Sequence, residues 1–257
     1  MKKFEGILLI TDFDGTLAYH GTISEENCRA IRYFQENGGL FTFSSGRQLG
    51  WVKKWSHLVM PNTWVSLING ALICDPAERE IAFRQYSGRE LLELAPRIFE
   101  ACPQIEFVNH SLEGEVYRQD PGTALAEDVL SRPVYKSVYH VLKEDSDEYV
   151  ARIRALAEPD FVVVRSWING IEVQRKGAGK GDSVRRLKTL LGDRVKLAVA
   201  AGNYENDMDL LQAADIGYAV GDAIPQLKAV ADRVTVDCKD HAIAAIIAEL
   251  EQKDLLH

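Results

Sequence analysis

The chain has 257 residues, of which 46% are hydrophobic and 26% are charged, and its formal net charge is -8. This composition is typical of an ordinary globular protein, and the length allows one large domain or two modest ones. The acidic balance argues against a protein that wraps the nucleic-acid backbone or sits on an anionic membrane surface, although a local cation or a metal can still hold a small anionic substrate.

Cysteine usage and the N-terminal residues indicate the compartment. Four cysteines, Cys28, Cys74, Cys102 and Cys238, lie far apart, with no Cys-x-x-Cys pair and no histidines at zinc-ligand spacing. We expect reduced and mostly buried thiols. Residues 1–6 are polar and lead directly into the first predicted strand, and no apolar run approaches the length of a membrane span. We therefore expect a cytoplasmic protein without a signal peptide.

Residues 7–17, ILLITDFDGTL, place two carboxylates directly after a short apolar run. The run over residues 7–10 predicts a strand that is buried on both faces. Ligands of open parallel sheets bind beyond the carboxyl ends of the strands, which is where Asp12 and Asp14 would lie. Taken alone, however, Asp-x-Asp-Gly is equally typical of a turn or of a loop that binds a cation.

The segments that follow alternate between helix and strand, and several of the strands end in polar residues. A short hairpin is predicted over 18–23, and Ser24 is a suitable N-cap for a helix over 25–36. A strand over 40–44 leads into Ser45-Gly46-Arg47, which would open a helix to about Trp55. A third strand over 64–68 ends at Asn69-Gly70, and a hairpin over 71–84 follows.

From about residue 85 the pattern changes, because no strand in the next ninety or so residues ends in an acid. Ser87 can cap a helix that runs to about Glu100, and further helices are predicted over 124–130 and 148–156. Strands are predicted over 105–109, 115–118, 134–142, 161–167 and 171–175, the last two joined by the turn signal Asn169-Gly170. This segment predicts an inserted α+β module whose sheet is largely antiparallel.

The first pattern then resumes. Gly177-Ala-Gly-Lys180-Gly opens a helix over 182–191, and an apolar strand over 196–201 ends in Gly202-Asn203-Tyr204-Glu205-Asn206-Asp207. Further alternation leads to a final helix over 241–251. The sequence therefore predicts an α/β fold with a doubly wound, Rossmann-like parallel sheet core, residues 1–84 and 178–257, and an inserted α+β cap domain, residues 85–177.

Five stretches occur in a fixed order: DFDGTL (12–17), SSGR (44–47), LINGA (67–71), GAGKG (177–181) and GNYENDMDLL (202–211). This order resembles the haloacid dehalogenase-like phosphohydrolases, and specifically their Cof-type subgroup, in which a class II, subtype B cap is inserted between the second and third motifs. The resemblance covers essentially the whole chain. It implies a core that performs phosphoryl transfer and a cap that selects the substrate.

The resemblance also implies a role for each polar residue. Asp12 would attack phosphorus to form an aspartyl-phosphate, and Asp14 would protonate the leaving oxygen and then activate water. Ser45 and Lys180 would hold the phosphoryl oxygens, the first through its hydroxyl and the second as a cation. Mg²⁺, which suits an all-oxygen site, would bridge nucleophile and phosphate. Its expected ligands are Asp12, Asp14 through the backbone carbonyl, Asn203 and Asp207.

The candidates on the substrate side are four further residues: Gly46, Arg47, Asn69 and Asn206. Most of the candidate residues have a structural alternative when each is considered alone. Ser45 alone could be a helix N-cap, Lys180 a solvated lysine and Asn69-Gly70 a hairpin turn. Asn206 is equally compatible with a positional role, with helix initiation and with a hydrogen bond at the site.

One departure from the family pattern concerns the metal. The fourth motif usually begins Gly-Asp, but this chain has Gly202-Asn203. An amide still offers an oxygen to Mg²⁺ but lacks the negative charge, so metal binding should be weaker. Asp207, four residues later, could compensate by ligating directly or through water. We predict that Asn203→Asp tightens magnesium binding.

The leading hypothesis is a Mg²⁺-dependent phosphatase that acts on small phosphorylated metabolites, most naturally sugar phosphates, as a monomer or homodimer without nucleic-acid or membrane partners. Two alternatives stay open: a phosphomutase of the same superfamily, and a phosphometabolite-binding regulatory protein with weakened catalysis, which Asn203 motivates. In the cap, Arg165, Glu172 and Arg175 are candidates for specificity, although each is at least as compatible with an ordinary surface charge.

Overall fold

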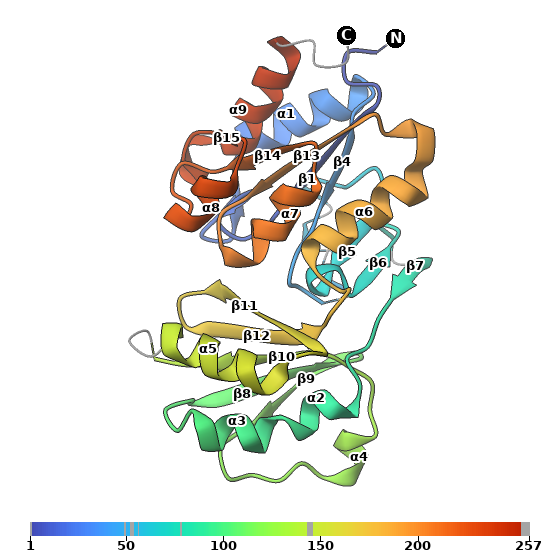
Figure 1. The fold of residues 1–257 in the computed structure, drawn as a ribbon. Coiled ribbons are helices and arrows are strands. Elements are labelled where there is room, and N and C mark those ends of the chain that lie inside the picture. Colours follow the sequence, from blue (N-terminus) through green and yellow to red (C-terminus); the bar gives the residue numbers. More distant parts are fainter. Residues whose placement is uncertain are drawn as a thin grey trace. The chain divides into compact units, whose positions relative to one another are not determined.

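A computed structural model describes residues 2–48, 50–51, 54–55, 57–77, 79–142 and 146–252. The chain divides into two compact units: Met1–Phe83 with Gly179–His257, called the core unit below, and Arg84–Ala178, called the inserted unit. Figure 1 shows the elements of each unit coloured along the sequence.

The core unit is built on a parallel sheet of five strands in the order β15-β14-β13-β1-β4. Strand β1, which lies between β13 and β4, is buried at every position, and both of its neighbours run parallel to it. This arrangement confirms the predicted α/β class with a parallel core sheet. The strands are β1 (Ile7–Thr11), β4 (Leu40–Phe43), β13 (Leu197–Gly202), β14 (Ile216–Ala219) and β15 (Arg233–Val234).

Helices cover both faces of this sheet, so the first four residues of β1, Ile7 to Ile10, are apolar. Leu8 and Ile10 point to one face and pack with apolar side chains of α6, α7 and α8. On the other face α1 packs against α9 and β4 (Figure 1). The helices of the core unit are α1 (Glu25–Glu36), α6 (Lys180–Leu191), α7 (Met208–Ala213), α8 (Pro225–Val230) and α9 (Ala242–Gln252).

Helix α1 has the predicted bounds, and its N-cap is also the predicted one. The Ser24 hydroxyl accepts a hydrogen bond from the Asn27 N–H, and Glu25 and Glu26 occupy the first turn, where acids interact favourably with the helix dipole. The hairpin predicted over 18–23 is present as β2 (Ala18–Tyr19) and β3 (Thr22–Ile23).

The predicted third strand forms, but its main partner differs from the expected one. It is β5 (Val65–Leu67), which pairs antiparallel with β6 (Leu72–Cys74) in a three-stranded sheet completed by β7 (Ile81–Arg84). It meets the end of β4 through a bridge between Ser44 and Ser66, and the Ser45 N–H donates to the Ser66 carbonyl at 3.0 Å. The cause is the tight loop after Leu67, which turns the chain back within four residues. The predicted helix to about Trp55 includes residues 49, 52 and 53, which lie outside the described residues.

The inserted unit is α+β, with an antiparallel sheet in the order β11-β12-β10-β8-β9. The strands are β8 (Phe107–Leu112), β9 (Glu115–Gln119), β10 (Val134–His140), β11 (Phe161–Trp167) and β12 (Gly170–Arg175). Its helices are α2 (Arg89–Glu93), α3 (Ala95–Ala101), α4 (Glu127–Leu130) and α5 (Ser146–Ala157). Apolar side chains from one sheet face and from these helices form one core.

The first helix of the inserted unit corrects one local prediction. In place of a helix from Ser87 to Glu100 there are two, α2 and α3, and the N-cap of α2 is Gly88. The buried Ser87 hydroxyl donates to the Tyr135 carbonyl and accepts from the Arg175 N–H. The Ser87 hydroxyl therefore forms hydrogen bonds with strands that are distant in sequence instead of capping the adjacent helix.

Two predictions about the whole chain can be compared with this fold. All four cysteines lie within the described residues, each is buried, and none forms a disulfide bond. Among the helices of the described ranges, none is long and apolar enough to cross a bilayer.

Candidate active site

Polar residues gather where three adjacent strands of the core sheet end. Asp12 follows β1, Ser44 and Ser45 follow β4, and Asn203 follows β13. Because β13, β1 and β4 are parallel neighbours, these residues share one edge of the sheet. Backbone bonds continue past the strands and keep the edge ordered: the Asp12 N–H donates to the Ala201 carbonyl at 2.8 Å.

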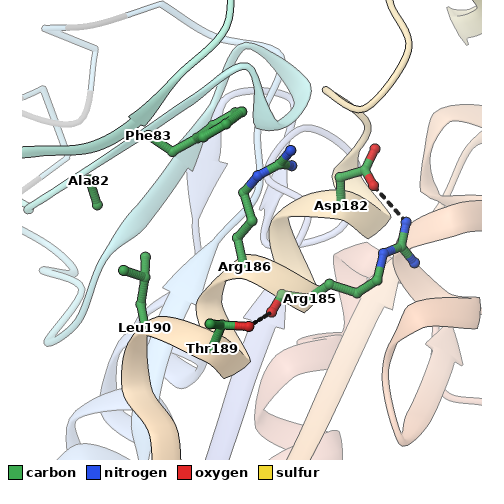
Figure 2. A pocket seen from close by; sticks show the side chains of 7 residues that line it. All are labelled: Ala82, Phe83, Asp182, Arg185, Arg186, Thr189 and Leu190. Atoms are coloured by element: carbon green, nitrogen blue, oxygen red, sulfur yellow. Dashed lines mark hydrogen bonds and ion pairs between the residues drawn. The ribbon is translucent and has the colours of Figure 1, made fainter.

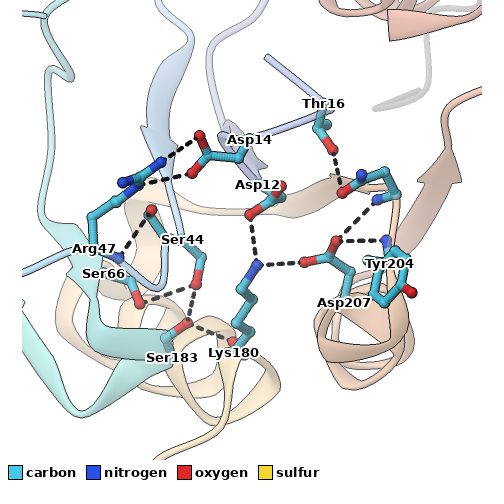
Figure 3. A network of polar contacts seen from close by, with 12 residues as sticks. Asp12, Asp14, Thr16, Ser44, Arg47, Ser66, Lys180, Ser183, Tyr204 and Asp207 are labelled. Carbon is cyan, nitrogen blue, oxygen red and sulfur yellow. Dashed lines mark hydrogen bonds and ion pairs between the residues drawn. The ribbon is translucent and has the colours of Figure 1, made fainter. Parts of the chain in front are cut away.

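Lys180 stands at the centre of this edge, between two carboxylates. Its Nζ lies 2.6 Å from Asp12 Oδ1 and 2.6 Å from Asp207 Oδ1, and all three side chains are buried (Figure 3). A lysine as the first residue of a helix opposes the helix dipole, so α6 alone does not favour it. The two carboxylates supply the compensating charge. We call this group the Asp12–Lys180–Asp207 cluster.

Asp207 also orders the loop that follows β13. While Oδ1 accepts from Lys180, Oδ2 accepts from the N–H groups of Asn203 and Tyr204 at 2.9 and 3.1 Å. This carboxylate thus positions both the ammonium and the loop. The contacts describe a positioning residue, and the predicted role of Asp207 as a metal ligand stays a prediction.

The cluster carries more negative than positive charge. Burial and the neighbouring Asp207 carboxylate raise the pKa of Asp12 to about 7, although Lys180 acts in the opposite direction. Burial alone would lower the pKa of the Lys180 ammonium, but Asp12 and Asp207 outweigh burial and raise it. When all three groups are ionised, one negative charge is in excess at a water-poor edge of the sheet.

Asp14 is held by a different cation. The Arg47 guanidinium donates from Nε to Asp14 Oδ2 at 3.0 Å and from Nη2 to Oδ1 at 2.8 Å, and both side chains are half exposed. Arg47 also lies over the Trp51 ring at 5.6 Å, and Trp51 contacts the Phe13 ring edge-on at 4.2 Å between centroids. Phe13 separates the two acids in sequence, so this aromatic stack supports the loop that carries both.

Ser45 and Asn69 lie next to each other through the backbone. The Asn69 N–H donates to the Ser45 carbonyl at 2.9 Å, and the buried Ser45 hydroxyl oxygen accepts from the Arg47 N–H at 3.2 Å. Because that oxygen accepts, the hydroxyl proton is available for a ligand. Asn69 has a left-handed backbone, φ 54°, in the loop between β5 and β6, so it does occupy a hairpin turn.

Asn203 faces the loop of the two acids. Its Oδ1 accepts from the Thr16 hydroxyl at 3.3 Å, and a Cβ placed on Gly15 would lie 2.4 Å from its Nδ2. Gly15 also has a φ of +83°, a backbone conformation that strains other residues, and a Cβ there would displace the Asn203 amide. Asn206 lies in the 3₁₀ turn Glu205–Asp207, and its predicted substrate contact stays a prediction.

The donor set fits magnesium. Within the described ranges no group of three or more His, Cys, Asp or Glu side chains is placed to hold a metal ion. Mg²⁺ does not need one, because it keeps several waters and uses one or two carboxylates together with substrate phosphate oxygens. The carboxylate of Asp12 and the amide of Asn203 are oxygen donors on neighbouring strand ends, and the excess negative charge of the cluster favours a cation beside it.

Sequence reasoning missed residues that act through tertiary contacts. Asp209 in α7 accepts a hydrogen bond from the Gly181 N–H at 2.9 Å, and a Cβ on Gly181 would meet the Asp209 carbonyl oxygen at 2.4 Å. The glycine after Lys180 therefore lets α7 approach the start of α6. The Ser44 hydroxyl contacts those of Ser66 and Ser183 at 3.1 and 3.3 Å, which links the β4 end to α6. Ser44, Gly181 and Asp209 lie within the motif stretches, but the sequence does not show which segments they contact.

The three candidate specificity residues of the inserted unit have structural partners. Arg165 forms an ion pair with Asp147, and Arg175 donates from Nη2 and Nε to the Ser87 carbonyl at 2.9 and 3.1 Å. Glu172 is buried and accepts from Lys136 Nζ at 2.7 Å. The alternative of an ordinary surface charge is thus wrong for Glu172.

Comparison with known proteins adds independent information. A family model described as haloacid dehalogenase-like hydrolase matches residues 9–247. The Bacillus subtilis phosphatase YwpJ is 27% identical over 285 residues, covering 95% of this chain and 99% of the relative. A haloacid dehalogenase-like hydrolase from B. subtilis superposes with a TM-score of 0.80 at 23% identity, covering 95% of this chain and 99% of that one.

A further solved structure is that of the sugar phosphatase BT4131, described as subclass IIB of the same superfamily. It superposes with a TM-score of 0.77 at 19% identity, covering 94% of this chain and 98% of that chain. At this identity the likeness concerns the fold, an α/β core with an inserted α+β unit.

Proposed function

The chain belongs to the haloacid dehalogenase-like hydrolase family, as its motifs predict, and we propose that it is a phosphatase that hydrolyses small phosphorylated metabolites, sugar phosphates among them, through an aspartyl-phosphate. The observation that carries this proposal is the Asp12–Lys180–Asp207 cluster, with Lys180 Nζ 2.6 Å from each carboxylate at the ends of parallel strands. The core unit is the proposed catalytic domain, and the inserted unit is the proposed source of substrate selectivity.

In the first proposed step Asp12 acts as the nucleophile. Its carboxylate oxygen forms a bond to phosphorus while the bond from phosphorus to the leaving oxygen breaks, and Asp14 gives that oxygen a proton. Lys180 is close enough to Asp12 to orient it, and its charge would offset that of the phosphoryl oxygens. The Ser45 hydroxyl would donate to a phosphoryl oxygen.

In the second step water attacks phosphorus. Asp14 accepts a proton from the water as the bond between phosphorus and the Asp12 oxygen breaks, which releases inorganic phosphate and regenerates the carboxylate. Arg47 holds Asp14 by two hydrogen bonds and would keep it oriented between the two steps.

Magnesium is the proposed cofactor. Asp12, the Asp14 carbonyl and Asn203 would hold it, with Asp207 as a further proposed ligand, directly or through water. When bound, the ion would neutralise charge on the phosphoryl oxygens. This role is supported by the oxygen donors and the excess negative charge of the cluster.

Phosphate release from an aryl phosphate with Mg²⁺ tests the proposal. Asp12→Asn removes the nucleophile, so kcat/KM should fall by roughly 10³-fold or more. The control is Asp193→Asn, which removes an exposed acid from the turn after α6 and should leave kcat/KM unchanged. Wild-type turnover in Asp12→Asn would contradict the assignment of the nucleophile.

The intermediate can be examined separately. Asp14→Asn removes both the acid of the first step and the base that activates water. An aryl phosphate has a leaving group that needs little protonation, so with this substrate the first step should still occur, and mass spectrometry after rapid quenching should find a phosphoryl group on the peptide that contains Asp12. Inorganic phosphate from the wild type, with no isomeric phosphate ester, argues against a phosphomutase. A chain that binds phosphate esters but releases no phosphate would instead support the regulatory alternative.

A further inference from the structure

One edge of strand β7 is open, and no residue of this strand belongs to the proposed active site. Within the described residues, β7 (Ile81–Arg84) is the outer strand of the three-stranded sheet β5-β6-β7 (Figure 1). The turn before it is ordered, because the Asp75 carboxylate accepts hydrogen bonds from the N–H groups of Arg79 and Glu80 at 2.6 and 2.7 Å. An ordered outer strand is a template on which another strand can pair.

The backbone of β7 shows which groups are available for such pairing. The Asp75 N–H donates to the Glu80 carbonyl at 2.9 Å, so the polar backbone groups of Glu80 point toward β6. Backbone N–H and carbonyl groups point to alternate sides of a strand from one residue to the next. Those of Ala82 therefore also point toward β6, while those of Ile81 and Phe83 point toward the open edge.

Apolar surface lies beside this edge. A pocket of about 390 Å³ lies between β7 and the outer face of α6, and Figure 2 shows the side chains that line it. Its apolar wall consists of Ala82, Phe83 and Leu190. Ile81 and Leu190 are 39% and 44% exposed, although both are large aliphatic residues. A further strand placed along β7 would remove part of this apolar surface from water, which favours pairing.

The residues of this edge are complementary to a second copy of themselves. The sequence from Glu80 to Arg84 reads EIAFR. When two copies pair antiparallel about a two-fold axis at Ala82, Glu80 of one copy lies opposite Arg84 of the other. In the same register Ile81 lies opposite Phe83, which is a favourable pair of a β-branched and an aromatic side chain. Opposite charges and apolar side chains therefore match at every position of the pairing.

The hydrogen-bond directions agree with this register. Ile81 and Phe83, whose polar backbone groups point toward the open edge, would exchange N–H and carbonyl bonds across the axis. Glu80 and Arg84 would form a pair without backbone bonds, and side chains approach each other more closely in such pairs. A register shifted by one residue would bring together backbone groups that already point toward β6.

From this complementarity we propose that two copies of the chain associate through their β7 edges, as an antiparallel two-fold pair centred on Ala82. A symmetric interface repeats each contact, so two Glu80–Arg84 pairs would flank the axis. Arg84 Nη1 already lies 2.8 Å from Glu113 Oε1. A guanidinium has several N–H donors and can bind a second carboxylate, as Arg89 does in this chain.

Sedimentation equilibrium of the full chain, without metal or substrate, tests the proposal. The paired strands are short, so the interface belongs with weak, transient complexes, and we expect a dissociation constant of roughly 1–100 µM. Glu80→Arg should weaken the dimer by roughly tenfold or more, because it turns two attractive contacts into repulsive ones. Glu100→Arg makes the same change of net charge at an exposed position of α3 and is the matched control, with an unchanged dissociation constant expected.

A mixture of two variants tests the register. Arg84→Glu alone should also associate more weakly, but an equimolar mixture with Glu80→Arg restores opposite charges at both contacts. The mixture should therefore associate about as tightly as the wild type. Arg84→Glu also loses its ion pair with Glu113, so circular dichroism checks its fold. If it does not fold, Ile81→Pro removes an N–H that faces the open edge, keeps the bonds to β6, and should weaken association by roughly tenfold or more.

Three results would overturn the inference. The first is a wild-type chain that stays monomeric up to about 500 µM, well above the expected dissociation constant. The second is a dimer that Glu80→Arg and Ile81→Pro leave unchanged. The third is a mixture of folded Glu80→Arg and Arg84→Glu that associates no more tightly than either variant alone. Activity is not the readout, so failure of the phosphatase proposal would leave this test intact.

Discussion

Each of the two units buries a lysine against carboxylate, but the charges are balanced in only one of them. In the inserted unit, Lys136 and Glu172 form an ion pair at 2.7 Å with side chains 5% and 3% exposed. In the core unit, Lys180 is 1% exposed and shared between Asp12 and Asp207 at 2.6 Å each. The first pair is neutral, and the second group keeps one negative charge when it is fully ionised.

The difference indicates what each group does. A buried ion pair costs desolvation energy that its own attraction only partly offsets, so a neutral pair needs nothing further, while an extra buried charge raises the cost. Two backbone N–H groups that donate to Asp207 offset part of this cost, and a cation beside the cluster would offset the rest. The unbalanced cluster lies at the carboxyl ends of parallel strands, and the balanced pair joins two strands within a sheet.

The largest effect is expected from removing the shared cation. Lys180→Met leaves Asp12 and Asp207 facing each other without an ammonium, so kcat/KM for phosphate release should fall by roughly 10²–10³-fold. Stability should fall as well, because two buried carboxylates then repel each other. Steady-state kinetics and urea unfolding measure the two effects.

Two further variants make this test decisive. Lys188→Met removes a partly exposed lysine from the same helix, one that pairs with Asp215, and should change neither quantity appreciably. If Lys180→Met does not fold, Lys180→Arg keeps the charge and tests geometry alone, with an expected loss of activity in a folded chain. Full activity in folded Lys180→Met would show that catalysis does not need the shared ammonium. The two buried lysines would then not differ in function.

Changes to the Lys136–Glu172 pair should alter the stability of the inserted unit rather than the rate of phosphate release. Lys136→Met leaves the Glu172 carboxylate buried without its ammonium partner, and breaking a buried pair in this way costs about 3–5 kcal/mol. The double variant Lys136→Met/Glu172→Leu should recover most of that loss, since no charge remains. Urea unfolding of the full chain, monitored for the transition of the inserted unit, measures both. A single variant as stable as the wild type would mean that the pair contributes nothing.

The sequence predicts those parts of this molecule that local chemistry determines. Helix α1 has its predicted bounds because Ser24 caps it and Gly38 and Gly39 follow it. The parallel core sheet follows from the alternation of apolar strands with helices. The candidate residues Asp12 and Lys180 are in direct contact, although 168 residues separate them. The order of the motifs predicts that these two residues share one site, whereas the periodicity of apolar residues alone does not.

Contacts between distant segments are what the sequence could not show. Strand β5 pairs antiparallel with β6 because the loop at Asn69 closes a hairpin. The Ser87 hydroxyl donates a hydrogen bond to the Tyr135 carbonyl instead of capping a helix. The sequence predicts Asp207 as a metal ligand that compensates for the charge missing at Asn203. Its hydrogen bond to Lys180 depends on how the start of α6 packs against the loop after β13. Neither segment predicts that packing by itself.

The smallest expected effect comes from placing a carboxylate at position 203, where this chain has an amide instead of the family's acid. Asn203→Asp adds a carboxylate beside the loop of Asp12, where the amide now accepts from Thr16. Unit charges about 4 Å apart interact by roughly 1 kcal/mol even in water. A divalent ion at that distance would gain about twice as much, so the magnesium midpoint for phosphate release should fall roughly thirtyfold.

The matched control for this change is Asn206→Asp, which adds the same charge in the following turn. It should shift the magnesium midpoint much less, because the added carboxylate is not one of the proposed ligands and water screens it. Comparable midpoints for the wild type and Asn203→Asp would contradict the assignment of residue 203 to the metal. Equal shifts in both variants would show that the cluster responds to charge in general, and its imbalance would then not mark a specific cation site.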